Sequence, residues 1–133
     1  MFVNCTNHPY EIWSETQRAA AKVFGEVVDI GFLPVQSEMT PEDIRKIVTE
    51  WAEKIESMNP DAVLVAGEFS SVFMLVDKLL SDGVNVICSC AKRQTREWKL
   101  PDGSSAKESI FVFERFRKYA YYGRENFEQS ADE

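Results

Sequence analysis

The most informative segment of this 133-residue chain is Ala62-Val63-Leu64-Val65-Ala66. It is a continuous apolar run, preceded by Asn59-Pro60-Asp61 and followed by Gly67. An apolar run of this length between turn residues and next to helical patterns is typical of a strand covered on both faces, as in a parallel sheet. The sequence therefore predicts an α/β domain with this strand at its centre.

Helix and strand patterns alternate on either side of the central strand. Further strands are predicted at residues 2–5, 27–30 and 84–88, and helices at 14–24, 41–58 and 69–80. Ser14-x-x-Gln17 has the pattern of a capping box, and Thr40-Pro41 that of an N-cap with proline in the first helical position. The order β-α-β-α-β-α-β predicts a doubly wound, mainly parallel sheet with right-handed crossovers. The buried stripe expected for the third helix comprises Phe69, Val72, Phe73, Val76, Leu79 and Leu80.

The alternation of helix and strand patterns ends after Cys90. Residues 93–99 and 106–115 are predicted as two strands joined by the turn Pro101-Asp102-Gly103-Ser104, which adds a C-terminal antiparallel hairpin to the sheet. Strand alternation places four side chains of the second strand on one face: Phe111, Phe113, Arg115 and Arg117. Such a face could stack nucleic-acid bases, or it could pack against a helix or a dimer partner. We favour the second interpretation. Residues 1–123 form one domain, and 124–133 a polar, acidic tail.

Composition excludes several classes of protein. The chain is 44% hydrophobic and 28% charged, as in ordinary globular proteins. No apolar run is long enough to span a membrane and the N-terminus lacks a signal-peptide pattern, so we expect no membrane partner. Three cysteines, an odd and low number, suit reduced thiols in the cytoplasm.

The charge is unevenly distributed along the chain. Residues 1–91 carry 6 Lys and Arg against 14 Asp and Glu, a net charge of −8, whereas residues 92–118 carry 8 against 4, a net charge of +4. The acidic whole argues against binding to long nucleic acids, which favours a broad basic face. It leaves room for a small anion in one basic pocket.

Polar side chains follow three of the predicted strands at their carboxyl ends. Ligands of open parallel sheets bind at that edge, at the topological switch point, and the first strand lies beside this point in the two commonest strand orders. The candidate site residues are therefore Asn4, Thr6, Asn7 and His8 after the first strand, Gly67, Glu68, Ser70 and Ser71 after the third, and Ser89, Lys92 and Arg93 after the fourth.

His8 is the only histidine of the chain. Imidazole changes its charge near neutral pH, which suits proton transfer. Alternatively, residues Thr6 to His8 cap the first helix and have no chemical role. Ser14 is the better cap for that helix, which favours the functional interpretation.

The segment after the central strand combines an anion site with a carboxylate. Ser70 and Ser71 offer hydroxyls and amides at a helix N-terminus, and Gly67 allows close approach of a ligand. Glu68 would repel phosphate, so it either stabilises the helix dipole or serves at a ribose or as a base. Lys92 and Arg93 are either solvated or bind phosphate, for which the arginine fork is well shaped.

The sequence lacks the motifs of several other kinds of catalytic or binding site. The chain has neither a Walker pattern nor G-x-G-x-x-G, which disfavours ATP hydrolysis and dinucleotide redox chemistry. Cys88-x-Cys90 has the wrong spacing for a zinc knuckle, and we expect no metal and no cofactor. Ser70 or Cys5 as a nucleophile beside His8 would need an acidic partner that the sequence does not identify.

Short motifs over most of the chain resemble a known family. Asn4-Cys-Thr-Asn-His-Pro9, Trp13 and Gln17, Gly67-Glu-Phe-Ser70, Ser89 with Arg93, and Phe113-Glu-Arg-Phe-Arg-Lys-Tyr119 are similar to small stand-alone CRISPR-associated proteins, the Rossmann-like CARF domains and ring nucleases of type III systems. The resemblance implies a Rossmann-like homodimer that binds a cyclic oligoadenylate across its two-fold axis and cleaves it without metal, which switches off the CRISPR signal. It places the ligand over the loops at residues 4–8 and 67–71, with Ser89, Lys92 and Arg93 nearby. A histidine acid or base departs from the pattern of the related domains.

Such a reaction needs no external nucleophile, because the ribose 2′-hydroxyl attacks the adjacent phosphorus. We expect Lys92 and Arg93 to stabilise the phosphate charge and His8 to transfer protons, with Thr6, Ser70 and Ser71 at phosphate or hydroxyls and Asn4 and Asn7 at base or ribose. Competing hypotheses are a non-catalytic sensor or sponge for the same messenger, a nucleoside N-glycosyl transferase or hydrolase with Glu68 as nucleophile, and a dimeric scaffold.

Overall fold

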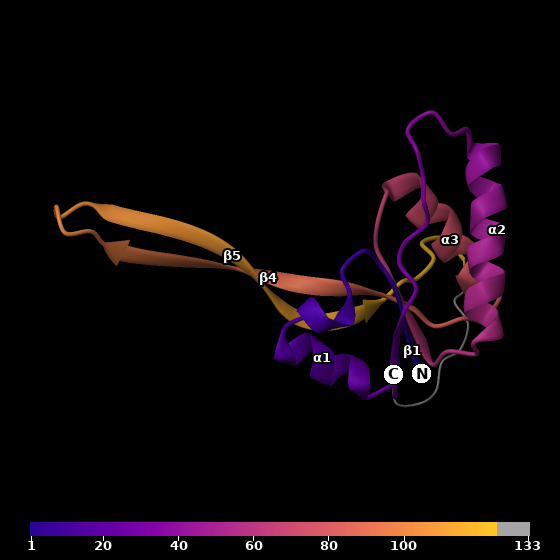
Figure 1. Cartoon of the computed structure of the whole chain (residues 1–133), viewed down its shortest axis with the longest axis horizontal. Coiled ribbons are helices and arrows are strands. Elements are labelled where there is room, and N and C mark those ends of the chain that lie inside the picture. The colour runs from indigo at the N-terminus through magenta and orange to yellow at the C-terminus, as the bar shows by residue number, and fades with distance from the viewer. Residues whose placement is uncertain (125–133) are drawn as a thin grey trace.

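The computed structural model describes residues 1–124 and has a mixed α/β architecture around one five-stranded sheet (Figure 1). The strand order is β2-β1-β3-β4-β5, in which the first four strands are parallel and β5 is antiparallel to β4. The strands span Phe2–Cys5 (β1), Val27–Asp29 (β2), Ala62–Val65 (β3), Val86–Lys99 (β4) and Ser105–Lys118 (β5). The predicted alternation of strands and helices up to β4 is confirmed.

The central position of β3 follows from its apolar run. All four of its residues are buried, and β1 beside it is buried throughout. Because side chains alternate along a strand, Val63 and Val65 point to one face of the sheet and Leu64 to the other, and both faces need cover.

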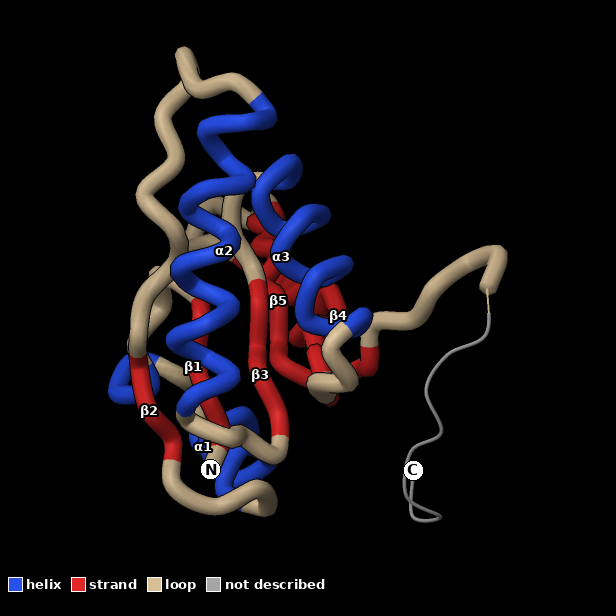
Figure 2. The backbone as a smooth tube through the Cα atoms, turned by 90° about the vertical axis from the view of Figure 1, so that its right-hand side faces the viewer, coloured by secondary structure: helices blue, strands red, loops and turns tan. Residues whose placement is uncertain are grey.

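Three helices cover the two faces of the sheet, with α2 (Pro41–Ser57) and α3 (Phe69–Ser81) on one face and α1 (Glu15–Lys22) on the other (Figure 2). A short 3₁₀ helix (Tyr10–Ile12) precedes α1 and was not predicted. Two of the helices begin at the predicted caps. Thr40 and Asp43 form a reciprocal capping box, and Ser14 accepts a hydrogen bond from the Gln17 backbone.

The buried stripe of α3 confirms the prediction at Val76, Leu79 and Leu80 and differs from it elsewhere. Leu75, Leu79 and Ser71 face the core, whereas Phe69 and Phe73 are 91% and 78% exposed. The apolar stripe of this helix is wider than the surface that the sheet and α2 cover. The outer part of the stripe therefore faces away from the core.

The predicted fourth strand and the first strand of the hairpin are one continuous strand, which corrects the sequence interpretation. β3 pairs with β4 only at Val86 and Ile87, and from Cys88 onward β4 pairs with β5 alone. The two strands continue together as a long arm (residues 88–117) that extends far beyond the rest of the sheet (Figure 1). At ~3.3 Å per residue, the twelve residues from Cys88 to Lys99 span about 40 Å.

A β-bulge in the arm reverses part of the predicted face. Ala91 pairs with Phe113 but Cys90 pairs with Arg115, so β5 contains one extra residue at this point. Phe111 and Phe113 therefore lie on the face that α1 covers, and Arg115 and Arg117 lie on the opposite face. The prediction of one shared aromatic and basic face is wrong because it assumed unbroken alternation.

Among residues 1–124, no helix combines the length and apolar character needed to cross a membrane. Of the predicted tail, residues 125–133 lie outside the described part. Arg124 is within it, and its guanidinium bonds the Asp77 carboxylate at 2.8 Å and lies over the Tyr121 ring.

Candidate functional site

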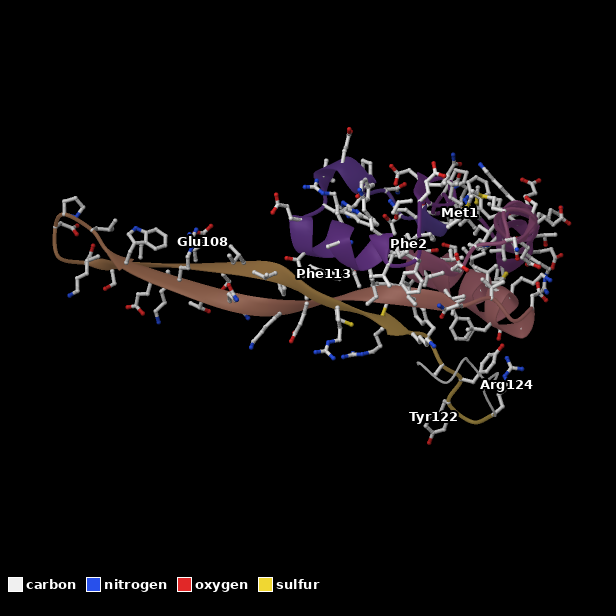
Figure 3. All side chains as sticks on the ribbon, turned by 90° about the horizontal axis from the view of Figure 1, so that it is seen from below. Met1, Phe2, Glu108, Phe113, Tyr122 and Arg124 are labelled. Atoms are coloured by element: carbon white, nitrogen blue, oxygen red, sulfur yellow. The ribbon has the colours of Figure 1, made fainter. Side chains whose placement is uncertain are left out.

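A pocket of about 350 Å³ opens at the carboxyl ends of β1 and β3, where the strand order 2-1-3 reverses direction and creates the switch point. We call it the His8 pocket. Figure 3 shows Phe113, one of its residues, at the base of the arm and on the side of α1. The pocket is lined by Thr6, His8, Ile12, Trp13, Ser14, Gln17, Leu64, Ala66, Ser89, Phe111 and Phe113.

The loop that carries His8 is held by its own backbone carbonyl. The His8 carbonyl oxygen accepts hydrogen bonds from Asn4 Nδ2 at 2.9 Å and from the Trp13 indole N–H at 2.8 Å. The Thr6 hydroxyl lies 3.3 Å from the same oxygen and also accepts a bond from the His8 backbone N–H at 3.2 Å. These contacts fix the backbone of His8 while its side chain stays exposed at the pocket.

Asn4 is part of the support of this loop. Its side chain is fully buried, and its two polar atoms bond Asp29, the His8 carbonyl and the Thr6 hydroxyl. These bonds occupy the groups with which an asparagine would recognise a base or ribose. The predicted binding residue therefore has a structural role in this arrangement, and the Thr6 hydroxyl is similarly engaged at the pocket wall.

Asn7 and Gly67 lie around Phe32 and not in the lining of the His8 pocket. Asn7 Oδ1 accepts a hydrogen bond from the Phe32 backbone N–H at 3.1 Å. A Cβ atom at Gly67 would overlap the Phe32 ring. The close approach that the glycine permits is therefore to an aromatic side chain of the same chain.

Glu68 caps α3 with its own side chain. Its carboxylate accepts bonds from the backbone N–H groups of Ser70 and Ser71, both at 2.9 Å, and from both hydroxyls at 2.8 Å. These bonds, those of the backbone first, lower the pKa of Glu68 to about 2. The amides predicted to bind phosphate thus hold an internal carboxylate, as the helix-dipole alternative expected, and the Ser71 side chain is buried.

Lys92 and Arg93 lie beyond the pocket, on opposite faces of the arm. Arg93 pairs with Phe111 and shares the face of the pocket aromatics, and its guanidinium bonds the Ser109 hydroxyl at 3.1 Å. Lys92 pairs with Val112 on the other face. The predicted cationic pair is therefore divided, and only Arg93 is on the side of His8.

Of the predicted site residues, the structure brings together Thr6, His8 and Ser89. It adds Trp13, Gln17 and the two arm phenylalanines, which were not among the predicted site residues. Gln17 was interpreted as part of a helix cap, and Trp13 and Gln17 were among the motifs of the family resemblance, without a role at the site. The aromatic alternation in β5 was the available signal for Phe111 and Phe113.

The buried thiol of Cys5 is not part of the pocket lining. Burial raises its pKa to about 12. Cys5 is thereby disfavoured as a nucleophile, because the reactive form of cysteine is the thiolate.

Comparison with known proteins gives one family. Residues 1–117 match the model described as the Uncharacterized protein MJ1673 family, and no curated protein matches the chain. The matched range includes every residue that lines the His8 pocket and the whole of the arm.

Proposed function

The chain belongs to the MJ1673 family, and from the geometry of the His8 pocket we propose that it is a metal-independent ring nuclease that cleaves a cyclic oligoadenylate, a tetra- or hexa-adenylate. The proposal includes a cytoplasmic homodimer with a Rossmann-like, doubly wound fold, whose substrate lies across the two-fold axis. In this role the protein ends signalling by type III CRISPR systems.

The observation that carries the proposal is the position of His8 on a fixed loop, in a pocket that two aromatic rings also line. Phe111 is 75% exposed, and Phe113 lies beside it on the same face. Bases stack on such rings without sequence readout. An adenine against Phe111 or Phe113 would leave its ribose and phosphate toward the polar side of the pocket, where His8, Thr6 and Ser89 lie.

The cleavage step is an intramolecular displacement. The ribose 2′-oxygen forms a bond to the adjacent phosphorus while the bond from phosphorus to the 5′-oxygen breaks, which leaves a 2′,3′-cyclic phosphate. Neutral His8 accepts the proton of the 2′-hydroxyl, and solvent protonates the departing 5′-oxygen. Binding rotates the 2′-oxygen into line, and a well-placed proton acceptor contributes roughly 100- to 10,000-fold.

The extra negative charge at phosphorus requires a cation. Arg93 is our candidate, because it lies on the same face of the arm as Phe111 and its partner, the Ser109 hydroxyl, is neutral and exposed. A guanidinium released from this hydroxyl gains a charged partner in the phosphate.

A binding protein without nuclease activity is the second candidate. It is favoured by the absence of any Lys or Arg from the pocket lining within residues 1–124. Such a pocket binds through its aromatic rings and hydroxyls but stabilises a charged transition state poorly. Transfer of an N-glycosyl group by Glu68 has less support, because its carboxylate is bonded to the start of α3.

Incubation of the protein in excess with labelled cyclic tetra- and hexa-adenylate and EDTA tests the proposal. We expect linear products ending in a 2′,3′-cyclic phosphate, and a rate at least about 100-fold lower for His8→Ala with ligand binding retained. Glu50→Gln, an exposed position on α2, is the matched control. Intact rings that bind in calorimetry would establish the sponge, and intact rings that do not bind would reject both functions.

A further inference from the structure

Within residues 1–124, one edge of β4 is unpaired along most of its length. β3 pairs with β4 at Val86 and Ile87, and beyond them β5 is the one described strand that lies beside β4. We call the free side of residues 88–99 the β4 edge. Residues 91–99 are all exposed, and the arm extends beyond the rest of the sheet (Figure 1). Because a two-stranded hairpin is only marginally stable in water, a further strand on this edge would stabilise the arm.

Two hydrogen bonds fix which backbone groups of β4 point to its free edge. The Asn85 carbonyl accepts from the Val63 N–H at 2.9 Å, on the side of β3. The Val86 carbonyl accepts from the Tyr119 N–H at 2.9 Å, on the side of β5. The direction reverses with each residue of a strand, and the bulge adds its extra residue to β5 and not to β4. The odd-numbered residues beyond Ile87 therefore present their N–H and C=O groups at the β4 edge.

The outer edge of β5 is less suited to a regular ladder of hydrogen bonds. Its bulge interrupts the alternation opposite Cys90 and Ala91, whereas β4 runs through this point without an extra residue. A bulge protects an edge from pairing, and a regular row of free donors and acceptors is a template for another strand. The β4 edge is therefore the stronger candidate for strand pairing.

The sequence of the β4 edge is complementary to itself in one antiparallel register. With Thr95 opposite Thr95 of a second copy, Arg93 of each copy lies opposite Glu97 of the other. Lys92 lies opposite Trp98, whose ring is a partner for the ammonium group. Paired threonines and opposite charges both stabilise an antiparallel contact. The residues that exchange hydrogen bonds in this register are the odd-numbered ones, as the direction of the free groups requires.

The neighbouring registers place like charges opposite each other. A two-fold centre at Arg93 or at Arg96 opposes two arginines, and a centre at Glu97 opposes two glutamates. A centre at residue 94 places Lys92 opposite Arg96. Like charges directly opposite each other destabilise a strand pair. The charge pattern thus selects the register at Thr95, and it selects a second copy of the same strand as the partner.

We propose that two copies of the chain pair antiparallel along the β4 edge, with the two-fold axis between their Thr95 residues. The two arms then form one four-stranded sheet of order β5-β4-β4-β5, and each copy presents the same surface to the other. Arg93 and Phe111 of each copy flank the axis on the face of the arm that the His8 pocket shares. Arginine has five N–H donors, so contact with Glu97 leaves donors for a phosphate. This inference gives the homodimer of the proposed function its interface, and it holds whether or not a ring is cleaved.

Disulfide trapping at single positions tests the pairing and its register. In a Cys88→Ser/Cys90→Ser background with oxidised glutathione, we expect Thr95→Cys to form a disulfide-linked dimer, because the paired Cα atoms would lie about 5.5 Å apart. Lys99→Cys is the matched control on the same edge, since the two Lys99 positions would be about 26 Å apart along the strands. Ser109→Cys, directly opposite Thr95 on β5, is the control for pairing along the other edge.

Charge reversal provides the second measurement. Arg93→Glu and Glu97→Arg each place like charges opposite each other across the contact, so we expect the dissociation constant of either homodimer to rise at least about tenfold in sedimentation. A mixture of the two variants restores opposite charges at both pairs, and we expect mixed dimers at least about tenfold tighter than either homodimer. Arg115→Glu, on the opposite face of the arm, is the control and is expected to leave the constant unchanged.

Four outcomes would overturn the proposal. They are a monomeric wild type, a failure of Thr95→Cys to be trapped, equal trapping of Lys99→Cys or Ser109→Cys, and a mixture of the charge variants that binds no more tightly than its components. None of these measurements depends on nuclease activity. A trapped dimer that leaves rings intact contradicts the nuclease alone, and a monomer that cleaves rings contradicts the interface alone.

Discussion

Asn4 Nδ2 donates a 2.7 Å hydrogen bond to Asp29 Oδ1 and so joins the carboxyl ends of β1 and β2. The same nitrogen donates to the carbonyl of His8, and Asp29 also accepts from the backbone N–H of Tyr10. One buried amide thus connects two strands to the loop that presents the imidazole. The polar cluster after β1 is in large part a support for His8.

Replacement of Asn4 by alanine is expected to destabilise the fold. The change leaves the Thr6 hydroxyl and the His8 carbonyl short of partners in a buried region, which costs about 2–3 kcal/mol of the free energy of unfolding. Asn7→Ala removes one bond at an exposed side chain and is expected to cost about 1 kcal/mol or less. Urea unfolding of both variants measures the difference, and equal costs would contradict the structural role of Asn4.

Acid unfolding is expected to depend on Glu68. The pKa of this carboxyl is about 2 in the folded protein and near its ordinary value of 4.5 in the unfolded chain, because bonds from Ser70 and Ser71 stabilise the charged form. Its contribution to stability is therefore complete above about pH 4.5 and is lost as the pH falls toward 2. Glu68→Gln should flatten the pH dependence of the urea midpoint in this window, with Glu50→Gln as the control. An unchanged pH profile would show that the cap contributes nothing.

Gly67→Ala is expected to disturb the packing of Phe32. The added methyl group would overlap the Phe32 ring, and such overpacking costs roughly 1–3 kcal/mol. Gly123→Ala is a suitable control, because a Cβ atom there meets no other atom within 4 Å. Thermal melting of Gly67→Ala and of Gly67→Ala/Phe32→Ala tests the cause, since the double variant removes the obstructing ring. If the loss of stability in the double variant equals the sum of the losses in the two single variants, the overlap with Phe32 is not the cause.

Phe111→Ala is expected to weaken binding of a cyclic oligoadenylate. Loss of one stacked base costs about 1–3 kcal/mol, which is roughly a 5- to 150-fold rise in the dissociation constant. Val112→Ala changes the next residue of the same strand, whose side chain lies on the opposite face of the arm. Calorimetry with both variants measures the effect, and equal losses would place the ligand elsewhere.

Cys5 is expected to resist thiol reagents in the folded protein. Its side chain is fully buried, and burial holds its pKa at about 12. Labelling at pH 8 should therefore be confined to Cys88 and Cys90, as mass spectrometry of the modified peptides would show. Rapid labelling of Cys5 without denaturant would reveal local opening of β1.

The elements that could be predicted from the sequence are those whose signals are local. A buried strand, a helix start and a tight turn each depend on a few neighbouring residues. Correct predictions of this kind are the apolar strand β3, the helix caps at Ser14 and Thr40, and the turn at Gly103. The switch-point rule also predicted correctly that His8 and Ser89 lie near each other, and both line the same pocket. The carboxyl ends of parallel strands lie at one edge of the sheet, whatever the order in which the chain forms the strands.

Which side chains face one another depends on the folded structure and could not be predicted from the sequence. One extra residue opposite Cys90 and Ala91 separates Phe113 from Arg115, and a bulge leaves no reliable mark in the pattern of a single strand. The engagement of Asn4 with Asp29, the burial of Ser71 under Glu68 and the exposure of Phe69 likewise depend on partners brought together by folding. Residue types and their spacing set the local conformation, whereas contacts between distant segments depend on strand pairing and on how much surface neighbouring elements cover.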